Sequence, residues 1–283
     1  MAELIREESI KKIVEKIAAS KKYRPLYRKT IERVVLDCAK RYPTKEAEKR
    51  SKNLLHQIWG IFYPTRPNFK KLAERFEESI KIVEGPTSHN LGDQMVRETV
   101  LPILKLHAST KERIPVLNNF YRQIFEITGQ PKTILDLASG LNPLTYFWLP
   151  KKSIRYLALD IDQEQNDFLR SVFRLLKVKN VKIKTGDVFA ARTLPRADVV
   201  FLFKILPLLA HQQKESLLKL LGNLRCQYLV VSFPTKTVSG KEKGMAEFYA
   251  KQFEELIKQK PWQVTKILFP TELVFIVNKQ NID

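Results

Sequence analysis

The segment ILDLASGLNPLTYFWLP, residues 134–150, has the pattern of a buried β-strand that runs into a tight turn. A dinucleotide-binding fold carries G-x-G-x-x-G at such a turn, because bare backbone must approach a negatively charged pyrophosphate at a helix N-terminus. This turn holds a single glycine, Gly140, after Ala138 and Ser139. The segment therefore favours a nucleotide-type ligand that lacks a pyrophosphate.

Strands and helices alternate on the C-terminal side of this segment. The apolar pattern predicts strands at 133–138, 155–160, 181–185, 198–203 and 227–233, and helices at 144–149, 163–177, 204–221 and 245–259. Two last strands, at 263–269 and 272–278, are joined at Pro270-Thr271 and predict a terminal antiparallel hairpin. Such alternation predicts an α/β fold, a Rossmann-like parallel sheet with helices on both faces.

The N-terminal side of the chain reads as helices alone. The pattern predicts them at 3–19, 26–41, 45–59, 68–83 and 91–106. A capping-box sequence, Ser109-Thr110-Lys111-Glu112, then predicts a helix that starts at Ser109 and runs to about residue 128. We therefore expect a helical N-terminal domain over 1–106 and a Rossmann-like domain over 107–283. We also expect the second domain to bind its cofactor after deletion of residues 1–85.

The charge of the chain indicates a polyanionic partner. The formal net charge is +20, from 50 Lys and Arg against 30 Asp and Glu. Residues 11–60 hold fifteen basic against five acidic side chains, with Tyr and Trp between them. A solvated helical face is the alternative for any one residue, but the cluster favours phosphate binding by counterion release. The candidate RNA contacts here are Lys21, Lys22, Arg24, Arg28 and Arg50.

Several classes of protein are disfavoured by the sequence. The cysteines, Cys38 and Cys226, lie far apart without a C-x-x-C motif, so we expect neither a metal site nor a disulfide framework. The N-terminus lacks the apolar core of a signal peptide. The most apolar run, VVFLFKILPLLA, is too short for a membrane span and carries Lys204 and Pro207. We expect a cytoplasmic, monomeric protein without a membrane partner.

Acidic residues follow three successive predicted strands. Asp136 and Asp160 end the first two, and Asp187 follows the third within Gly186-Asp187-Val188. In a parallel sheet ligands bind at the carboxyl ends of the strands, where the strand order reverses. One acid can accept two ribose hydroxyls and another an adenine amino group. A lone strand-end Asp is often only a helix cap, but the set of three favours S-adenosylmethionine, whose sulfonium is attracted by carboxylates, over NAD.

The target atom is narrowed by motifs that are missing. Methylation of an exocyclic amine usually goes with [DNS]-P-P-[YFW] after the fourth strand, where this chain has LFKI at 202–205. Methylation of a pyrimidine carbon needs a cysteine in a cleft, and Cys226 begins a strand. An atom with its own lone pair, such as guanine N7, needs no general base, so that catalysis reduces to positioning and electrostatics. The sequence is compatible with that target.

Four motifs together resemble one known family. They are LHASTKER (106–113), ILDLASGLNP (134–143), FKILPLL (203–209) and SFPTKTVSGKEKGM (232–245). In this order they resemble the Arm/Rmt family of 16S ribosomal RNA methyltransferases, which modify N7 of guanine 1405 and confer aminoglycoside resistance. The resemblance covers most of the chain. It implies an S-adenosylmethionine-dependent enzyme of the class I methyltransferase fold that acts on the 30S subunit, with drug resistance as its biological role.

The resemblance also implies residue roles. Arg113 matches the arginine that pairs with the cofactor carboxylate, Asp160 the ribose acid, and Asp187-Val188 the adenine pair. Lys204 and Lys241 are expected to position the target, with no general base. Ala138 stands where the family has glycine, and Lys241 where arginine is common, which loses the bidentate fork. The implied cofactor contacts are Phe62, His107, Ala108, Ser109, Arg113, Ala138, Gly140, Asp160, Asp187, Val188, Phe203 and Gln212, and the implied RNA contacts of the late loop are Lys236, Lys241, Lys243 and Met245.

Two other functions stay open on the sequence alone. One is a methyltransferase for another ribosomal or transfer RNA site. The other is a non-catalytic RNA-binding protein with a relic cofactor pocket. An enzyme that modifies a base generally extrudes it from the helix, so we expect an aromatic stacking surface from one of five candidates, Tyr146, Phe147, Trp148, Phe248 or Tyr249.

Overall fold

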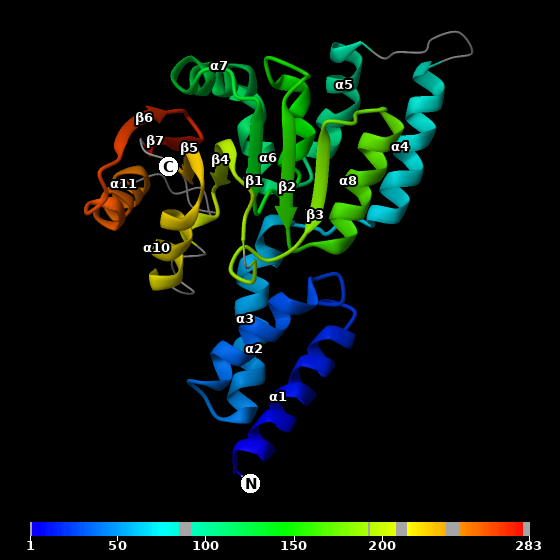
Figure 1. Cartoon of the computed structure of the whole chain (residues 1–283). Coiled ribbons are helices and arrows are strands. Elements are labelled where there is room, and N and C mark those ends of the chain that lie inside the picture. Colours follow the sequence, from blue (N-terminus) through cyan, green and yellow to red (C-terminus); the bar gives the residue numbers. More distant parts are fainter. Residues whose placement is uncertain (1, 85–91, 192, 208–213, 236–243, 280–283) are drawn as a thin grey trace.

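The computed structural model describes residues 2–84, 92–191, 193–207, 214–235 and 244–279. Its centre is a seven-stranded sheet of order β3-β2-β1-β4-β5-β7-β6 (Figure 1). The strands are β1 (Thr133–Leu137), β2 (Arg155–Asp160), β3 (Val181–Thr185), β4 (Ala197–Phe203), β5 (Cys226–Pro234), β6 (Gln263–Leu268) and β7 (Glu272–Asn278). The strands β1 to β5 are parallel, and β7 runs antiparallel to both β5 and β6. The predicted α/β sheet with a terminal antiparallel hairpin is confirmed.

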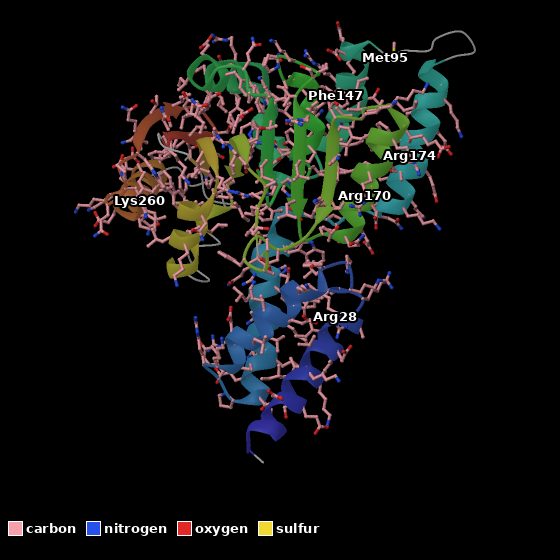
Figure 2. All side chains as sticks on the ribbon, in the orientation of Figure 1. Arg28, Met95, Phe147, Arg170, Arg174 and Lys260 are labelled. Atoms are coloured by element: carbon pink, nitrogen blue, oxygen red, sulfur yellow. The ribbon has the colours of Figure 1, made fainter. Side chains whose placement is uncertain are left out.

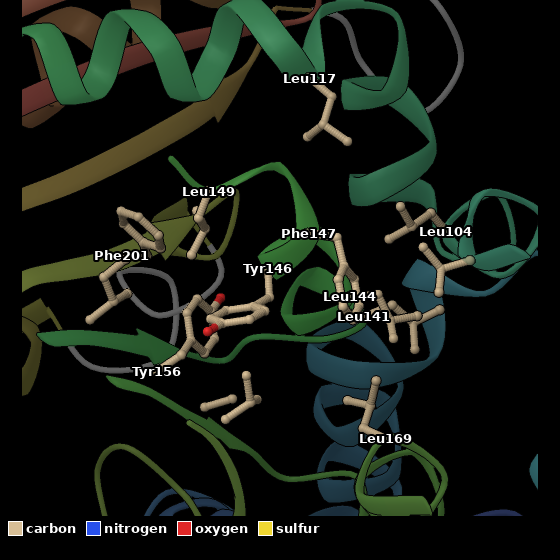
Figure 3. Close-up of a cluster of buried hydrophobic side chains, with 14 of the residues drawn as sticks. Leu104, Leu117, Leu141, Leu144, Tyr146, Phe147, Leu149, Tyr156, Leu169 and Phe201 are labelled. Carbon is tan, nitrogen blue, oxygen red and sulfur yellow. The ribbon is translucent and has the colours of Figure 1, made fainter. Parts of the chain in front are cut away.

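Side chains of the central strands alternate between two cores. On β4, Val199, Phe201 and Phe203 enter one core, while Val200 and Leu202 enter the other. This alternation follows from the pleat, and the continuous apolar run of the strand from burial on both faces. Figure 3 shows part of the first core, where Tyr146 lies beside Tyr156, and Leu141 and Leu144 lie beside Phe147. The chain reverses its strand order between β1 and β4, which sets the switch point at the carboxyl end of β1.

The first three helices form a unit of their own. They are α1 (Ala2–Ala19), α2 (Arg28–Ala39) and α3 (Thr44–Trp59), and we call them the helical unit. Their shared core includes Ile17, Val34, Val35 and Leu55, all fully buried. In Figure 1 the helical unit lies below the sheet, at the end toward which β2 points.

The next two helices pack with the sheet. Phe69 and Phe76 of α4 (Phe69–Glu84) and Val100 and Leu104 of α5 (Asp93–Leu104) belong to the first core of the sheet. Figure 1 shows α4 beside α8 (Gln163–Leu175), and both α4 and α5 lie away from the helical unit. The packing therefore divides the chain between residues 60 and 68, whereas the sequence places the domain boundary at residue 106. A helical pattern alone does not reveal against which core a helix packs.

The predicted helix at 109–128 is interrupted. The structure has α6 (Ala108–Arg113), a 3-10 turn η2 (Ile114–Val116) and α7 (Leu117–Thr128). Pro115 lies in the interruption, where its ring and its missing N–H prevent a continuous helix. The expected capping box does not form, because His107 is the N-cap residue of α6 and has no side-chain cap hydrogen bond. Instead the Thr110 hydroxyl donates to the carbonyl oxygen of Leu104 at 2.6 Å.

Two other predicted helices also differ from the structure. The segment predicted at 144–149 is a 3-10 helix, η3 (Asn142–Trp148), with Pro143 at its start. Lys204 is not helical, because its φ of +58° lies in the left-handed region. Helical residues begin at Leu206, two residues after Lys204; past the described range that ends at residue 207, the next described helix is α10 (Lys214–Asn223), and α11 (Met245–Ile257) precedes the hairpin. The turn at Lys204 thus shifts the helix start from the predicted residue 204 to Leu206.

Candidate functional site

A cavity lies at the carboxyl ends of β1, β2, β3 and β4, and encloses about 850 Å³ including its open mouth. The sheet side contributes Asp136, Asp160 and Asp187, so the three strand-end acids meet here. The opposite wall belongs to the helical unit and the turn after it. Nine of the predicted cofactor residues line the cavity: Phe62, His107, Ser109, Ala138, Gly140, Asp160, Asp187, Val188 and Phe203.

The turn after β1 is held in a left-handed conformation. Ala138 has φ +52° and Gly140 has φ +53°. A Cβ on residue 140 would come within 2.8 Å of His107 Nε2, so only glycine fits there without a shift. Ala138 adopts the same region with a side chain, at a cost of about 1–2 kcal/mol. The alanine that replaces the family's glycine is therefore a strained residue in the cavity wall.

Asp160 ties the turn to the second strand. Its Oδ2 accepts from the Gly140 N–H at 2.8 Å, and its Oδ1 accepts from the Asp162 N–H at 3.0 Å. Burial raises the pKa of Asp160 to about 6, against the lowering effect of the Gly140 hydrogen bond. The carboxylate is thus mostly ionised at neutral pH and protonates at mildly acidic pH.

Asp136 lies deeper in the same wall. It is buried, and its Oδ2 accepts from Asn142 Nδ2 at 2.9 Å and from the Tyr156 hydroxyl. Burial raises the pKa of Asp136 to about 7, although both hydrogen bonds act in the opposite direction. A cationic ligand beside it would favour the ionised carboxylate.

His107 lines the cavity with an uncharged imidazole ring. Its ring stacks on Phe62 with 5.1 Å between centroids and meets the edge of Tyr63 at 5.0 Å. Burial, together with the charges of Arg113 and Lys204, lowers the pKa of His107 to about 3. The imidazole is therefore neutral at physiological pH and does not repel a cationic ligand.

Unpartnered polar atoms gather around this cavity. Of the buried side-chain atoms without a hydrogen-bond partner in the described part of the chain, four belong to cavity residues: Thr30 Oγ1, His107 Nδ1, Ser139 Oγ and Gln165 Nε2. A buried polar group left without a partner costs about 1–3 kcal/mol and calls for an explanation. A ligand with several donors and acceptors supplies the missing partners, and the nucleoside and amino acid parts of S-adenosylmethionine fit this need.

Arg113 is occupied by a partner inside the protein. Its Nε and Nη2 donate to the two carboxylate oxygens of Glu272 at 2.7 and 2.9 Å, and Nη1 donates to Asn142 Oδ1 at 2.7 Å. The guanidinium is fully buried between the rings of Phe120 and Phe203. Arg113 does not line the cavity, and neither does Ala108. Pairing of Arg113 with a cofactor carboxylate stays a prediction that this ion pair does not support.

Lys204 belongs to the same buried charge cluster. Its Nζ lies 2.6 Å from Glu112 Oε2 and 3.4 Å from Glu272 Oε1, and its side chain is only 5% exposed. Burial opposes ionisation of Glu272, yet Arg113 and Lys204 outweigh it and hold the pKa of Glu272 below its usual value. A target-facing Lys204 would have to leave these partners. Gln212, Lys236, Lys241 and Lys243 lie outside the described residues, and Met245 begins α11.

The aromatic candidates for base stacking differ in whether their side chains are buried in the core or exposed. Tyr146 and Phe147 are buried, pack against each other and Phe173, and serve the core (Figure 3). Trp148 packs at the edge of the same core, with Arg97 over its ring. Phe248 is 54% exposed on α11. The hydrophobic periodicity of the sequence could not distinguish the buried aromatic side chains from the exposed ones, because it does not show which side of a short 3-10 helix faces the sheet.

A second, broader hollow carries three of the five RNA contacts that were predicted within residues 11–60. Lys21, Lys22 and Arg24 line it, and we call it the basic groove. It also includes Arg66 and Lys70, which the sequence did not single out. Trp59 and Tyr63 line both the basic groove and the cofactor cavity.

The remaining basic candidates lie on the outer surface of the helical unit. Arg28, at the outside of α2 in Figure 2, pairs with Glu15 and Glu32. Arg50 pairs with Glu46. Arg170 and Arg174 lie on α8 in the same view, and Arg170 pairs with Asp167.

The helical unit is fastened to the loop after β2. Asp162 Oδ2 accepts from Trp59 Nε1 at 2.8 Å, and the two carboxylate oxygens of Asp162 bind Arg66 at 2.5 and 3.0 Å. The backbone N–H of Tyr27 donates to the carbonyl oxygen of Ile161 at 2.8 Å. Deleting residues 1–85 would break these contacts and remove one wall of the cavity. The structure therefore argues against the expectation that the remaining domain binds its cofactor alone.

The cavity residues that the sequence reasoning missed include three polar ones, Thr30, Arg33 and Gln165. Gln165 follows the ribose acid by five residues, so its place in the first turn of α8 was a usable signal. Thr30 and Arg33 come from α2, and nothing in the sequence connects that helix with the sheet.

Two features, a metal-binding cluster and a membrane-spanning helix, are absent from the part of the chain that the structure describes. No group of three or more His, Cys, Asp and Glu side chains in the described ranges could hold a metal ion. Among the helices that the structure describes, none is long and apolar enough to cross a membrane.

Comparison with known proteins identifies the family. The 16S rRNA (guanine(1405)-N(7))-methyltransferases of Proteus mirabilis and Frankia casuarinae are 32% and 33% identical to this chain, over 95% and 96% of it and 97% and 95% of their own lengths. The structure of the 16S rRNA methyltransferase RmtF in complex with S-adenosyl-L-homocysteine superposes with a TM-score of 0.77 at 28% identity, covering 96% of this chain and 98% of RmtF. The 16S rRNA methylase RmtB gives a TM-score of 0.74 at 27% identity, covering 96% of this chain and 98% of RmtB. The ribosomal RNA methyltransferase (FmrO) family matches residues 19–276, and the chain belongs to that family.

Proposed function

We propose that this protein transfers a methyl group from S-adenosylmethionine to N7 of guanine 1405 in the 16S RNA of the 30S subunit. The single observation that carries the proposal is the cavity at the switch point, where three strand-end carboxylates and four unpartnered polar atoms surround one space. Full-length relatives that bear the name of this reaction support the choice of target.

We assign different residues of the cavity to the ribose, the adenine and the sulfonium of S-adenosylmethionine. Asp160 accepts the ribose hydroxyls, since its carboxylate stands at the end of β2 with a pKa of about 6. Asp187 and Val188 hold the adenine. When bound, the cofactor supplies an electrophilic methyl group on a sulfonium. The carboxylates of Asp136 and Asp160 favour that positive charge, and the neutral His107 does not oppose it.

No general base is required of the protein. Guanine N7 carries a lone pair and loses no proton on methylation, so the residues around the cavity need only orient the base and exclude water. Phe203 and Phe62 offer apolar surface at the cavity wall. Positioning of the target is assigned to the charge of Lys241, and Lys204 shares that role only if it leaves Glu112 and Glu272 when the target binds.

The N-terminal and C-terminal parts of the chain have different roles, namely RNA docking and cofactor binding. The helical unit, with the turn after it up to residue 62, docks on ribosomal RNA through the basic groove, and residues 63–283 hold the cofactor and the flipped guanine. Lys21, Lys22 and Arg24 all line this groove and can neutralise phosphates of the RNA. The protein acts in the cytoplasm as a monomer, and aminoglycoside resistance is its proposed biological role.

Transfer of tritiated methyl groups tests the proposal. Purified protein is offered 30S subunits, 70S ribosomes and naked 16S RNA side by side. We expect transfer to 30S subunits to exceed transfer to the other two, because the docking surface needs folded RNA. Transfer to transfer RNA alone would point to another RNA target, and failure to bind S-adenosylhomocysteine in calorimetry would point to a relic pocket.

A further inference from the structure

One face of α2 closes the cofactor cavity. Thr30 and Arg33 both line the cavity, and residues three apart lie on the same face of a helix. Their rise along the axis is about 4.5 Å, so the two side chains reach neighbouring points of the wall. This helix belongs to the helical unit, which has its own core and which the sequence predicts only as an RNA-docking element.

Arg33 holds the carboxylate that is assigned to the adenine. Its Nε donates to Asp187 Oδ2 at 2.9 Å, and its Nη2 lies 2.9 Å from the same oxygen. Its guanidinium also stacks on Phe189, with 5.2 Å between Cζ and the ring centroid. The other carboxylate oxygen, Oδ1, accepts from the Phe189 N–H at 2.9 Å. The loop after β3 is thereby fixed from two sides, and the orientation of the Asp187 carboxylate is set by α2.

Thr30 presents a hydroxyl that has nothing to bind. Its side chain is fully buried, and within the described ranges no hydrogen-bond partner reaches Oγ1. A threonine inside a helix ordinarily turns its hydroxyl back to a carbonyl of the preceding turn, as Thr99 of α5 does toward Met95 at 2.8 Å. The hydroxyl of Thr30 instead remains available at the cavity wall.

We propose that Thr30 is an adenine-binding residue and that Arg33 is the positioning residue for Asp187, so that α2 completes the adenine subsite. The proposal rests on S-adenosylmethionine as the cofactor. The edge of adenine offers an amino donor beside a ring nitrogen acceptor. Asp187 accepts from the amino group, and the hydroxyl of Thr30, one helical turn from Arg33, donates to the ring nitrogen N1.

Calorimetry with S-adenosylhomocysteine tests the role of Thr30 without any need for activity. Thr30→Val keeps the shape and removes the hydroxyl, and we expect it to bind roughly two- to tenfold more weakly, the effect of one neutral hydrogen bond. Thr30→Ser should bind within about twofold of the wild type, because it keeps the donor. Thr99→Val is the matched control, and thermal unfolding of each variant reports on folding.

Ligand analogues separate recognition from a mere structural effect. The 1-deaza analogue of S-adenosylhomocysteine lacks the ring nitrogen, so Thr30→Val should lose nothing further with it. The analogue without the amino group should remove the loss caused by Arg33→Lys, for which Arg122→Ala is the exposed control. A structural defect would weaken all three ligands by the same factor.

The outcomes distinguish this proposal from the function on which it rests. If the wild-type protein binds no S-adenosylhomocysteine, the proposed function and the proposal both fail. If the wild type binds it, and Thr30→Val binds equally well or loses the same factor with every analogue, the adenine role of Thr30 is wrong while the proposed function stands. The same comparison for Arg33→Lys decides whether α2 positions Asp187.

Discussion

Removing Arg113 should show whether this arginine serves the cofactor or the fold. In the structure it is fully buried and makes three hydrogen bonds, two to Glu272 and one to Asn142, at 2.7 to 2.9 Å. Arg113→Met fills the space between Phe120 and Phe203 but leaves the Glu272 carboxylate with Lys204 alone. Breaking a buried pair by removing one partner costs about 3–5 kcal/mol.

This loss is large enough to measure by thermal unfolding. At about 2 cal/mol/K of unfolding entropy per residue, a chain of 283 residues loses about 1.8 °C in Tm for each kcal/mol, so Tm should fall by about 5–9 °C. The double variant Arg113→Met/Glu272→Leu removes both buried charges and should recover most of the stability, since a buried ion pair is seldom better than an apolar pair. Lys204 keeps Glu112 as its partner in that variant.

The double variant also separates the two roles of Arg113. If the arginine serves the fold, a stable double variant binds S-adenosylhomocysteine within about threefold of the wild type. If it pairs with the cofactor carboxylate, the double variant is stable but loses that charged hydrogen bond, worth about 1.5–3 kcal/mol. Our reasoning is refuted if Arg113→Met unfolds within 1 °C of the wild type, or if the double variant is no more stable than the single one.

Three further changes probe the cavity and the basic groove. Affinity for S-adenosylhomocysteine should fall between pH 7.5 and pH 5.5, because Asp160, with a pKa of about 6, loses its charge in that window. The variant Asp160→Asn should bind more weakly at pH 7.5 and show a smaller fall in affinity. Equal pH profiles for the variant and the wild type would contradict this. Gly140→Ala should cost about 1–2 kcal/mol in denaturant unfolding, because φ is +53° there, and unchanged stability would argue against the turn. Replacing Lys21, Lys22 and Arg24 by Glu should weaken 30S binding and flatten its salt dependence by about 0.7–0.9 in slope per lost phosphate contact, whereas an unchanged slope would indicate a solvated surface.

The sheet could be predicted from the sequence because its strands carry a strong signal. The ranges 155–160, 181–185 and 272–278 agree with β2, β3 and β7 residue for residue. The ends and interruptions of the helices next to the turns could not be predicted as well, because single residues determine where these helices begin and break. Pro115 divides one helix, and the left-handed Lys204 delays another.

Strand patterns alone predicted the candidate site only on its sheet side, and the family resemblance added Phe62, His107 and Ser109. Strand-end acids mark the carboxyl edge of a parallel sheet, so Asp160 and Asp187 were found from spacing alone. The wall from α2 was not predictable, because it depends on how the helical unit docks. That docking rests on long-range contacts such as Trp59 with Asp162 and Arg33 with Asp187, which leave no periodic trace in the sequence.

Mapping the methyl group on the ribosome tests the central claim most directly. The 30S subunits are incubated with the protein and S-adenosylmethionine, the 16S RNA is cleaved at N7-methylguanine, and the cleavage site is located by primer extension. We expect one new stop, at guanine 1405, that is absent when S-adenosylhomocysteine replaces the methyl donor. A stop at another nucleotide, or methyl incorporation without cleavage at guanine 1405, would contradict it.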